Sequence, residues 1–88
     1  MKILLAEDER RMAQALKELL KQENYEVDHF EDGLSALDAI EGDVYDMIIL
    51  DVMMPGMNGF QVAKNARAKG IKAPILMLTA KGEVDDKV

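Results

Sequence analysis

The sequence predicts an α/β fold in which helices cover both faces of a parallel sheet. Short apolar runs of strand length alternate with longer segments whose apolar residues recur every three or four positions. The connections between them are short, which favours right-handed crossovers between parallel strands. Three runs, residues 3–6, 47–50 and 75–78, contain no polar residue, as is typical of strands buried on both faces.

Composition limits the chain to one small domain, residues 1–88, with an aliphatic core. The formal net charge is −6 and the basic residues look scattered, so we expect no direct nucleic-acid partner. Cysteine is absent, which is compatible with the cytoplasm. The first apolar run is too short for a signal peptide or a membrane span. We therefore expect a cytoplasmic domain that makes no membrane contact.

The first strand is predicted over residues 2–6 and ends in Glu7, Asp8 and Glu9. An amphipathic helix follows from Arg10, capped by Asp8 or Glu9. Its expected apolar stripe consists of Met12, Ala13, Leu16, Leu19 and Leu20. Residues 25–30 alternate as an edge strand does, and His29 is interpreted as a surface or packing residue.

The second helix is predicted to open at Asp32-Gly33 and to stop at Gly42. Its expected apolar stripe is Leu34, Ala36, Leu37 and Ile40. The buried run Met47 to Leu50 then predicts a central strand that ends at Asp51.

A loop rich in proline and glycine follows the central strand, and Asn58 is the expected cap of a third helix over residues 59–69. The residues expected to be buried in this helix are Phe60, Val62, Ala63 and Ala66. The fourth strand is predicted over residues 75–78. Residues 81–88 are interpreted as a loop and the first turn of another helix.

The predicted strand order is 2-1-3-4, as in the flavodoxin-like doubly wound fold, because the amphipathic second strand suits an edge and the first and third suit the interior. This order places a crevice between strands one and three. It brings Glu7, Asp8 and Asp51 together, with Thr79 within reach.

Three carboxylates in one crevice raise one another's pKa unless a cation lies among them. Oxygen ligands without His or Cys favour Mg²⁺ or Mn²⁺. Asp51 can then attack a phosphoryl group as a nucleophile, and the Thr79 hydroxyl can donate a hydrogen bond to that group.

Three motifs, ILLAED, LDVMMPGMNG and PILMLTA, together resemble the receiver domain of bacterial two-component response regulators, in order and in spacing. The resemblance spans the whole chain. It implies a phosphoacceptor signalling domain in a two-component phosphorelay, whose partner is a sensor histidine kinase. The first and third motifs resemble receivers joined to DNA-binding output domains, which implies transcription regulation.

The resemblance also assigns roles to residues. It implies that Asp51 accepts the phosphoryl group and that Thr79 donates a hydrogen bond to it. It further implies that Glu7, through water, and Asp8, directly, bind Mg²⁺ together with Asp51. The backbone carbonyl of Met53 completes the implied metal ligands.

The chain departs from the family pattern at its end. Receiver domains continue through a fifth strand with a lysine and a switch aromatic, and through further helices, none of which occurs in this sequence. We therefore expect a C-terminally truncated receiver without that lysine. Its fourth strand is expected to be an exposed edge. A homo-oligomer is the expected consequence, formed through this strand or by exchange of elements.

Other functions remain open at this stage. A Mg²⁺-dependent phosphatase also uses an Asp nucleophile, but the position of its second Asp is occupied by Met53, which cannot transfer a proton. A flavin-binding domain would suffer repulsion between the flavin phosphate and residues 7–9. An inactive, self-associating interaction fragment would form no acyl phosphate. We expect a phosphoacceptor switch and no turnover enzyme.

Overall fold

The computed structural model describes residues 1–78 and 84–85. Four parallel strands form a sheet in the order β2-β1-β3-β4, which confirms the predicted flavodoxin-like order. Their bounds are β1 (Lys2–Ala6), β2 (Glu26–Phe30), β3 (Met47–Asp51) and β4 (Ile75–Leu78). The inner strands β1 and β3 are the apolar ones, because only side chains without polar groups suit both faces of a covered sheet.

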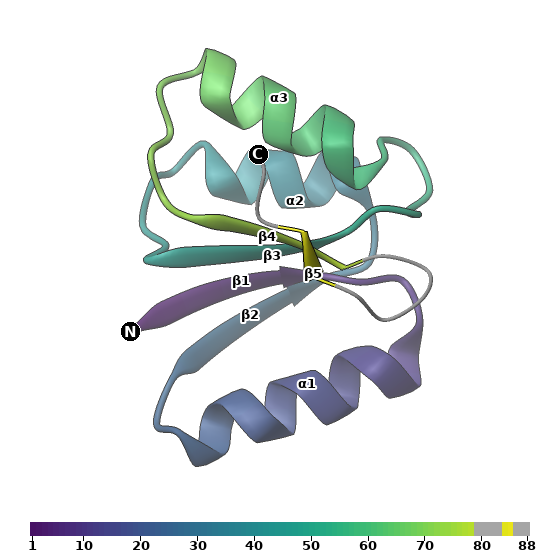
Figure 1. The fold of residues 1–88 in the computed structure, drawn as a ribbon, viewed down its shortest axis with the longest axis vertical. Helices are drawn as coiled ribbons and strands as arrows, with labels where there is room; N and C mark the ends of the chain where they lie inside the picture. The colour runs from purple at the N-terminus through teal and green to yellow at the C-terminus, as the bar shows by residue number, and fades with distance from the viewer. Residues whose placement is uncertain (79–83, 86–88) are drawn as a thin grey trace.

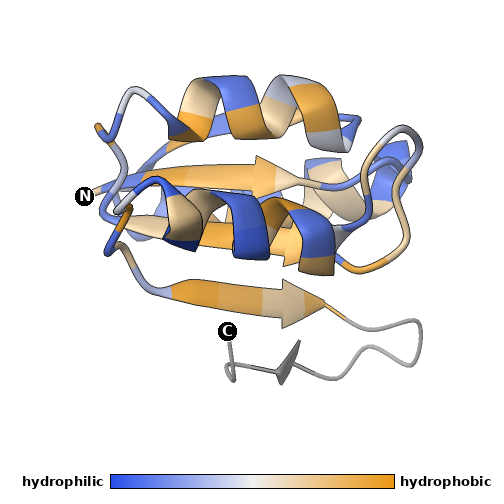
Figure 2. Cartoon of the chain, turned by 90° about the horizontal axis from the view of Figure 1, so that it is seen from above, coloured by the Kyte–Doolittle hydropathy of each residue, from blue (hydrophilic) through white to orange (hydrophobic). Residues whose placement is uncertain are grey.

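Helices cover both faces of the sheet (Figure 1). Helix α1 (Arg10–Gln22) lies on one face, and α2 (Gly33–Ile40) and α3 (Gly59–Ala68) lie side by side on the other. Figure 2 shows apolar strands between helices that carry both polar and apolar residues. Strands and helices that alternate along the sequence therefore lie in separate layers of the fold.

All three helices begin at a side-chain cap. The Glu9 carboxylate accepts hydrogen bonds from the amides of Arg11 and Met12, so Glu9 rather than Asp8 is the cap of α1. Asp32 caps α2 through the Ser35 amide at 2.7 Å, and this bond lowers the pKa of Asp32. Asn58 and Gln61 form a reciprocal capping box at α3.

The predicted apolar stripes of the helices are partly wrong. Four apolar side chains expected to be buried are exposed: Met12, Leu19, Leu34 and Phe60, with exposed fractions of 46%, 58%, 60% and 47%. Each helix presents only a narrow strip to the sheet, so apolar residues at the margins of a stripe face solvent. Helix α3 also ends one residue earlier than predicted, with Lys69 as its C-cap.

The sheet separates two cores. The larger lies under α2 and α3 and includes Ile48 and Leu50 from β3. The smaller lies under α1 and includes Ile49, which points the other way because side chains alternate along a strand.

The predicted exposed edge at β4 is partly wrong. A two-residue strand, β5 (Val84–Asp85), pairs antiparallel with Met77 and Leu78. It replaces the helical turn expected there, because pairing satisfies the backbone groups of an otherwise open edge. The remaining predicted loop and helix residues, 81–83 and 86–88, lie outside the described residues. Self-association through β4 stays a prediction, and only Ile75 and Leu76 still lack a neighbour on that side among residues 1–78 and 84–85.

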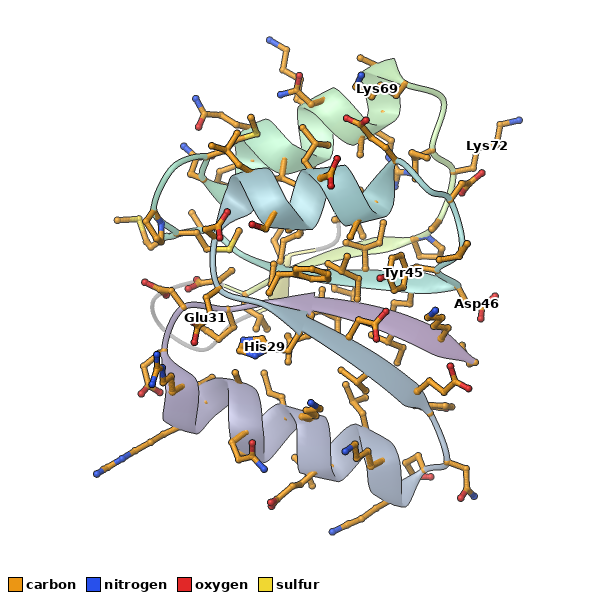
Figure 3. The ribbon with its side chains drawn as sticks, turned by 180° about the vertical axis from the view of Figure 1, so that it is seen from behind. His29, Glu31, Tyr45, Asp46, Lys69 and Lys72 are labelled. Atoms are coloured by element: carbon orange, nitrogen blue, oxygen red, sulfur yellow. The ribbon has the colours of Figure 1, made fainter. Side chains whose placement is uncertain are left out.

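A polar network joins three strands at the end of the sheet where they begin. The Tyr45 hydroxyl donates a hydrogen bond to Asp28 of β2 at 2.7 Å, and Asp46 accepts one from the Lys2 amide at 2.7 Å. Figure 3 labels Tyr45 and Asp46 at the start of β3. Burial, followed by the bond to Asp28, raises the pKa of Tyr45 to about 12.

No helix among the described residues is long and apolar enough to cross a membrane.

Candidate functional site

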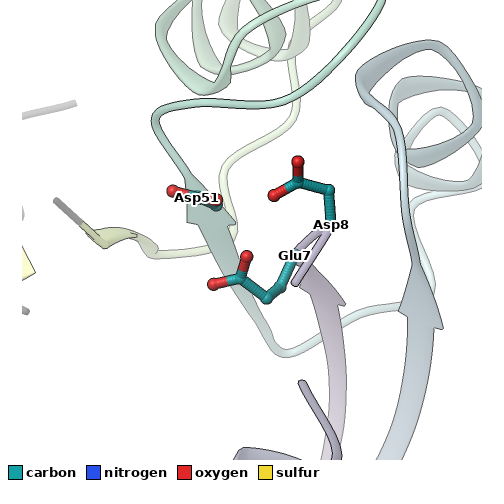
Figure 4. Close-up of side chains that lie close together, drawn as sticks. All are labelled: Glu7, Asp8 and Asp51. Carbon is teal, nitrogen blue, oxygen red and sulfur yellow. The ribbon is translucent and has the colours of Figure 1, made fainter. Parts of the chain in front are cut away.

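Three carboxylates meet where β1 and β3 end. Glu7 and Asp8 directly follow β1, and Asp51 is the last residue of β3. The two strands are neighbours, with Ala6 opposite Leu50, so their ends lie side by side. One carboxylate oxygen from each of the three residues lies within 4.8 Å of the others. Figure 4 shows the side chains converging on the same space. The structure thus brings together the three acidic residues that the sequence predicted.

Glu7 is the most buried of the three, with 5% of its surface exposed. Its Oε2 accepts a hydrogen bond from the Glu9 amide at 3.0 Å, and its own amide donates to the Phe30 carbonyl at 3.0 Å. The His29 Nε2 lies 2.8 Å from the Glu7 carbonyl oxygen, which can only accept, so Nε2 carries a proton and donates it. These backbone contacts hold Glu7 in place from the adjoining strand β2.

The sequence predicted that His29 is a surface or packing residue, and in the structure its ring also contacts the backbone of Glu7. His29 lies opposite Leu5 in the β1–β2 register, two residues before Glu7. The predicted strand order made these two strands neighbours, but no prediction placed His29 beside Glu7. The direction of the ring depends on the pleat of an edge strand, which the alternating pattern did not resolve.

Asp51 is also buried, with 9% of its surface exposed. Its Oδ1 accepts a hydrogen bond from the Met53 amide at 3.2 Å, which fixes the carboxylate against the loop that follows β3. The Gly59 amide donates to the Val52 carbonyl at 2.9 Å. A Cβ atom on Gly59 would collide with the Asp51 carbonyl oxygen, so only glycine lets α3 start this close to the acid.

Burial and the closeness of the three carboxyl groups disfavour negative charge at this site. Burial, followed by the neighbouring carboxyl groups of Asp51 and Asp8, raises the pKa of Glu7 from 4.5 to about 7. Two like charges 4.8 Å apart repel by about 3 kcal/mol at an effective dielectric of about 20. A proton on Glu7 relieves this repulsion, and a divalent cation relieves it for all three groups. The donor set, three hard carboxylate oxygens, fits Mg²⁺ or Mn²⁺.

Two further site residues were predicted, Met53 and Thr79, and of these the structure describes Met53. Met53 lies in the loop after β3 with 66% of its surface exposed, and its amide is already bound to Asp51. The loop is held against α2, because the Gly33 amide donates to the Pro55 carbonyl at 3.3 Å. Thr79 lies outside the described residues, so its role stays a prediction.

The fold and the site define a class. This is a doubly wound α/β protein with an acidic cluster in the crevice between its two inner strands, which is where ligands bind in such sheets. The family described as "Response regulator receiver domain" matches residues 3–88. The chain belongs to this family of receiver domains.

Similar proteins agree with this assignment. The chain is 42% identical to the transcriptional regulatory protein TcrA of Mycobacterium tuberculosis over 87 residues, 99% of this chain and 34% of TcrA. It is 41% identical to the transcriptional regulatory protein TctD of Salmonella typhimurium over 88 residues, 100% of this chain and 39% of TctD. The chain thus spans between a third and two fifths of these regulators.

A solved structure matches along most of the chain. The response regulator TrrA of Thermotoga maritima, in complex with Mg²⁺ and BeF, has a TM-score of 0.84 at 43% identity, over 90% of this chain and 69% of TrrA. TrrA has also been solved in complex with the histidine kinase ThkA, and that copy covers 93% of this chain at 41% identity with a TM-score of 0.84. The likeness therefore rests on sequence as well as on fold.

Proposed function

We propose that this chain is a phosphoacceptor switch, in which Asp51 takes a phosphoryl group from a sensor histidine kinase with the help of Mg²⁺. The convergence of Glu7, Asp8 and Asp51 within 4.8 Å at the end of two buried strands carries this proposal. The TrrA structures with Mg²⁺ and BeF and with ThkA support it by similarity.

The residues of the chain have distinct roles in the proposed reaction. A carboxylate oxygen of Asp51 attacks phosphorus, the bond from phosphorus to the kinase histidine nitrogen breaks, and an acyl phosphate forms as the imidazole leaves. The Met53 amide holds the other Asp51 oxygen. Glu7, Asp8, Asp51 and the Met53 carbonyl would hold the cation, with Mn²⁺ as a substitute for Mg²⁺. When bound, the cation supplies positive charge that offsets charge on the transferred group. Thr79 would donate a hydrogen bond to that group.

The proposal also includes the location of the domain, its class and its partner. It is a switch in the cytoplasm and no turnover enzyme, since the chain only gains and loses its own phosphoryl group. Its kinase partner and any transcriptional output follow from similarity to TrrA and TcrA. A phosphatase of the kind considered above places a second Asp two residues after the nucleophile, and here Met53 occupies that position.

The decisive experiment is incubation with acetyl phosphate and Mg²⁺, followed by intact-mass measurement. We expect a gain of one phosphoryl group that requires Mg²⁺, is removed by hydroxylamine as acyl phosphates are, and is absent in Asp51→Asn. Asp38→Asn, which alters an exposed carboxylate of α2, should be phosphorylated as the unaltered chain is. A protein that gains no mass, or an Asp51→Asn variant that gains as much, would refute the proposal. Repeated turnover of a phosphate ester would instead favour the phosphatase.

A further inference from the structure

Basic residues of this acidic chain are concentrated in one stretch. All 17 Asp and Glu residues lie outside residues 52–82, whereas that stretch has five of the 11 Lys and Arg residues. Four of these five lie on α3 or in the loop directly after it: Lys64, Arg67, Lys69 and Lys72. The other six basic residues are scattered over the rest of the chain, so this stretch is distinguished by its lack of acidic residues.

The solvent-facing side of α3 carries an exposed aromatic ring as well as a basic residue. Val62, Ala63 and Ala66 are buried against the core, whereas Phe60, Lys64 and Ala68 face solvent. The exposed three are spaced by four residues and so follow one another along one side of the helix. We call these three residues, together with Lys69 and Lys72 that follow the end of the helix, the basic α3 face.

Two lysines of this face are unpaired within residues 1–78 and 84–85. Neither Lys64 nor Lys72 makes a hydrogen bond or an ion pair with the described residues. Lys69 pairs with Glu41 at 3.5 Å, but both side chains are largely exposed, at 52% and 39%. Such a pair is weak and exchanges readily. In Figure 3, Lys72 extends away from the body of the molecule. Positive charge is therefore available here although the chain as a whole is acidic.

We propose that the basic α3 face docks an acidic segment of a partner protein, in which at least two carboxylates lie on one side of one apolar side chain. The carboxylates would pair with Lys64 and Lys72, and the apolar side chain would cover Phe60. The stretch from residue 60 to 68 measures about 12 Å along the helix, so a segment of two to three helical turns spans it. This surface is separate from the acidic cluster and does not depend on phosphorylation of Asp51.

Charge and shape favour this partner over other macromolecules. A long nucleic acid would extend past the face along a chain of net charge −6, and that repulsion opposes binding. An acidic segment of limited length contacts the lysines alone. The exposed ring of Phe60 adds an apolar contact that a phosphate backbone does not use.

The test uses a synthetic peptide of about 14 residues, enough for about four helical turns, with one leucine near one end and glutamates spaced by four toward the other. The isotope-labelled chain is titrated with it at about 50 mM salt, where surface charges are weakly screened, and amide shifts are followed by NMR. We expect shifts confined to residues 60–72. Raising the salt should weaken binding, because the contacts are exposed ion pairs.

Variants identify which residues contribute to the free energy of peptide binding. The double variant Lys64→Glu/Lys72→Glu should lose about tenfold in affinity, and Phe60→Ala about fivefold, since the ring is only half exposed to begin with. The double variant Arg11→Glu/Lys21→Glu, an equal charge change at exposed residues of α1 across the sheet, should leave affinity within about twofold.

Several results would overturn the inference. Absence of shifts on α3, or equal binding by Lys64→Glu/Lys72→Glu, would remove the basic face as the site. Equal binding of a peptide with serine in place of leucine would remove the role of Phe60. A DNA duplex that binds the same residues more tightly would reassign the face to nucleic acid. Concentration-dependent shifts there without peptide would assign it to a second copy.

Discussion

Folding buries Glu7, and this burial disfavours the charged carboxylate that ion binding requires. Folding buries it to 5% exposure beside Asp51, and ion binding needs its carboxylate charged. The result is a pKa raised from 4.5 to about 7, mainly by burial and then by Asp51. Without a cation, the folded chain therefore keeps a proton on Glu7 across a pH range in which the unfolded chain has lost it.

This proton predicts a particular pH dependence of stability. Between about pH 4.5 and 7 the folded state binds more protons than the unfolded state, so the free energy of unfolding falls as pH rises. Glu7→Gln removes the titration and should be about 1 kcal/mol more stable than the unaltered chain at about pH 8, with little difference near pH 4.5. Urea unfolding at several pH values without divalent ions measures this.

Glu26→Gln is the matched control for the pH experiment. Glu26 is exposed on the edge strand and far from the acidic cluster, so this change should shift stability equally at all pH values. If Glu7→Gln and Glu26→Gln show the same pH profile, the raised pKa of Glu7 is not a property of the folded chain.

At the residue scale, the sequence predicted the acidic cluster but not what supports it. Glu7, Asp8 and Asp51 could be placed because each follows an apolar run, and strand order then makes their ends neighbours. The support from His29 could not be placed, because it depends on side-chain direction at an edge strand. Roles that rest on the family resemblance, such as that of Thr79, stay predictions.

At the scale of elements, the junction between β3 and α3 decides how accurately Asp51 is placed. Gly59 is the first residue of α3 and touches both the Asp51 backbone and the Met77 side chain. The loop between them therefore has little freedom. Helix α3 and the end of β3 form one rigid support for the acid.

Gly59→Ala tests this junction. The added methyl group would collide with the backbone of Asp51, so α3 must shift, and we expect a loss of about 2 kcal/mol in stability together with weaker phosphorylation by acetyl phosphate. Gly42→Ala is the control, since its methyl group would meet only the Ala39 carbonyl oxygen at an ordinary contact distance of 3.4 Å. Thermal melts and intact mass measure both effects. Equal melts for the two variants would contradict the close approach.

Elements were predicted well where local chemistry decides them and poorly where packing does. Polar or acidic side chains before a periodic run predicted helix starts after Asp8 or Glu9, at Asp32-Gly33 and after Asn58. The structure places the caps at Glu9, Asp32 and Asn58. The exposure of Leu34 and the strand at Val84–Asp85 depend on which surfaces meet in the folded chain. Neither the helical period nor strand propensity carries that information.

At the scale of the whole molecule, the two faces of the sheet are unequally covered. The core under α2 and α3 holds most of the buried residues, whereas α1 buries only Ala13 fully and leaves Met12 and Leu19 exposed. The residues of α1 that complete the smaller core, Leu16 and Leu20, are only partly buried. Less apolar surface is therefore removed from water on the α1 side, and less free energy holds that helix in place.

This imbalance predicts that α1 opens separately from the rest of the chain. Native-state hydrogen exchange should show amides in the middle of α1 exchanging through a partial opening, at a lower free energy than those of β1, β3 and α3. Low concentrations of urea should accelerate exchange in α1 less steeply than in the inner strands, because the partial opening exposes less surface. Ala13→Gly should widen the gap, since it removes the only fully buried side chain of α1 and weakens the helix by about 1 kcal/mol. The exposed Ala15→Gly carries the same helix penalty without loss of burial and separates the two contributions. Exchange of α1 and α3 with one common free energy would show that the two cores unfold together.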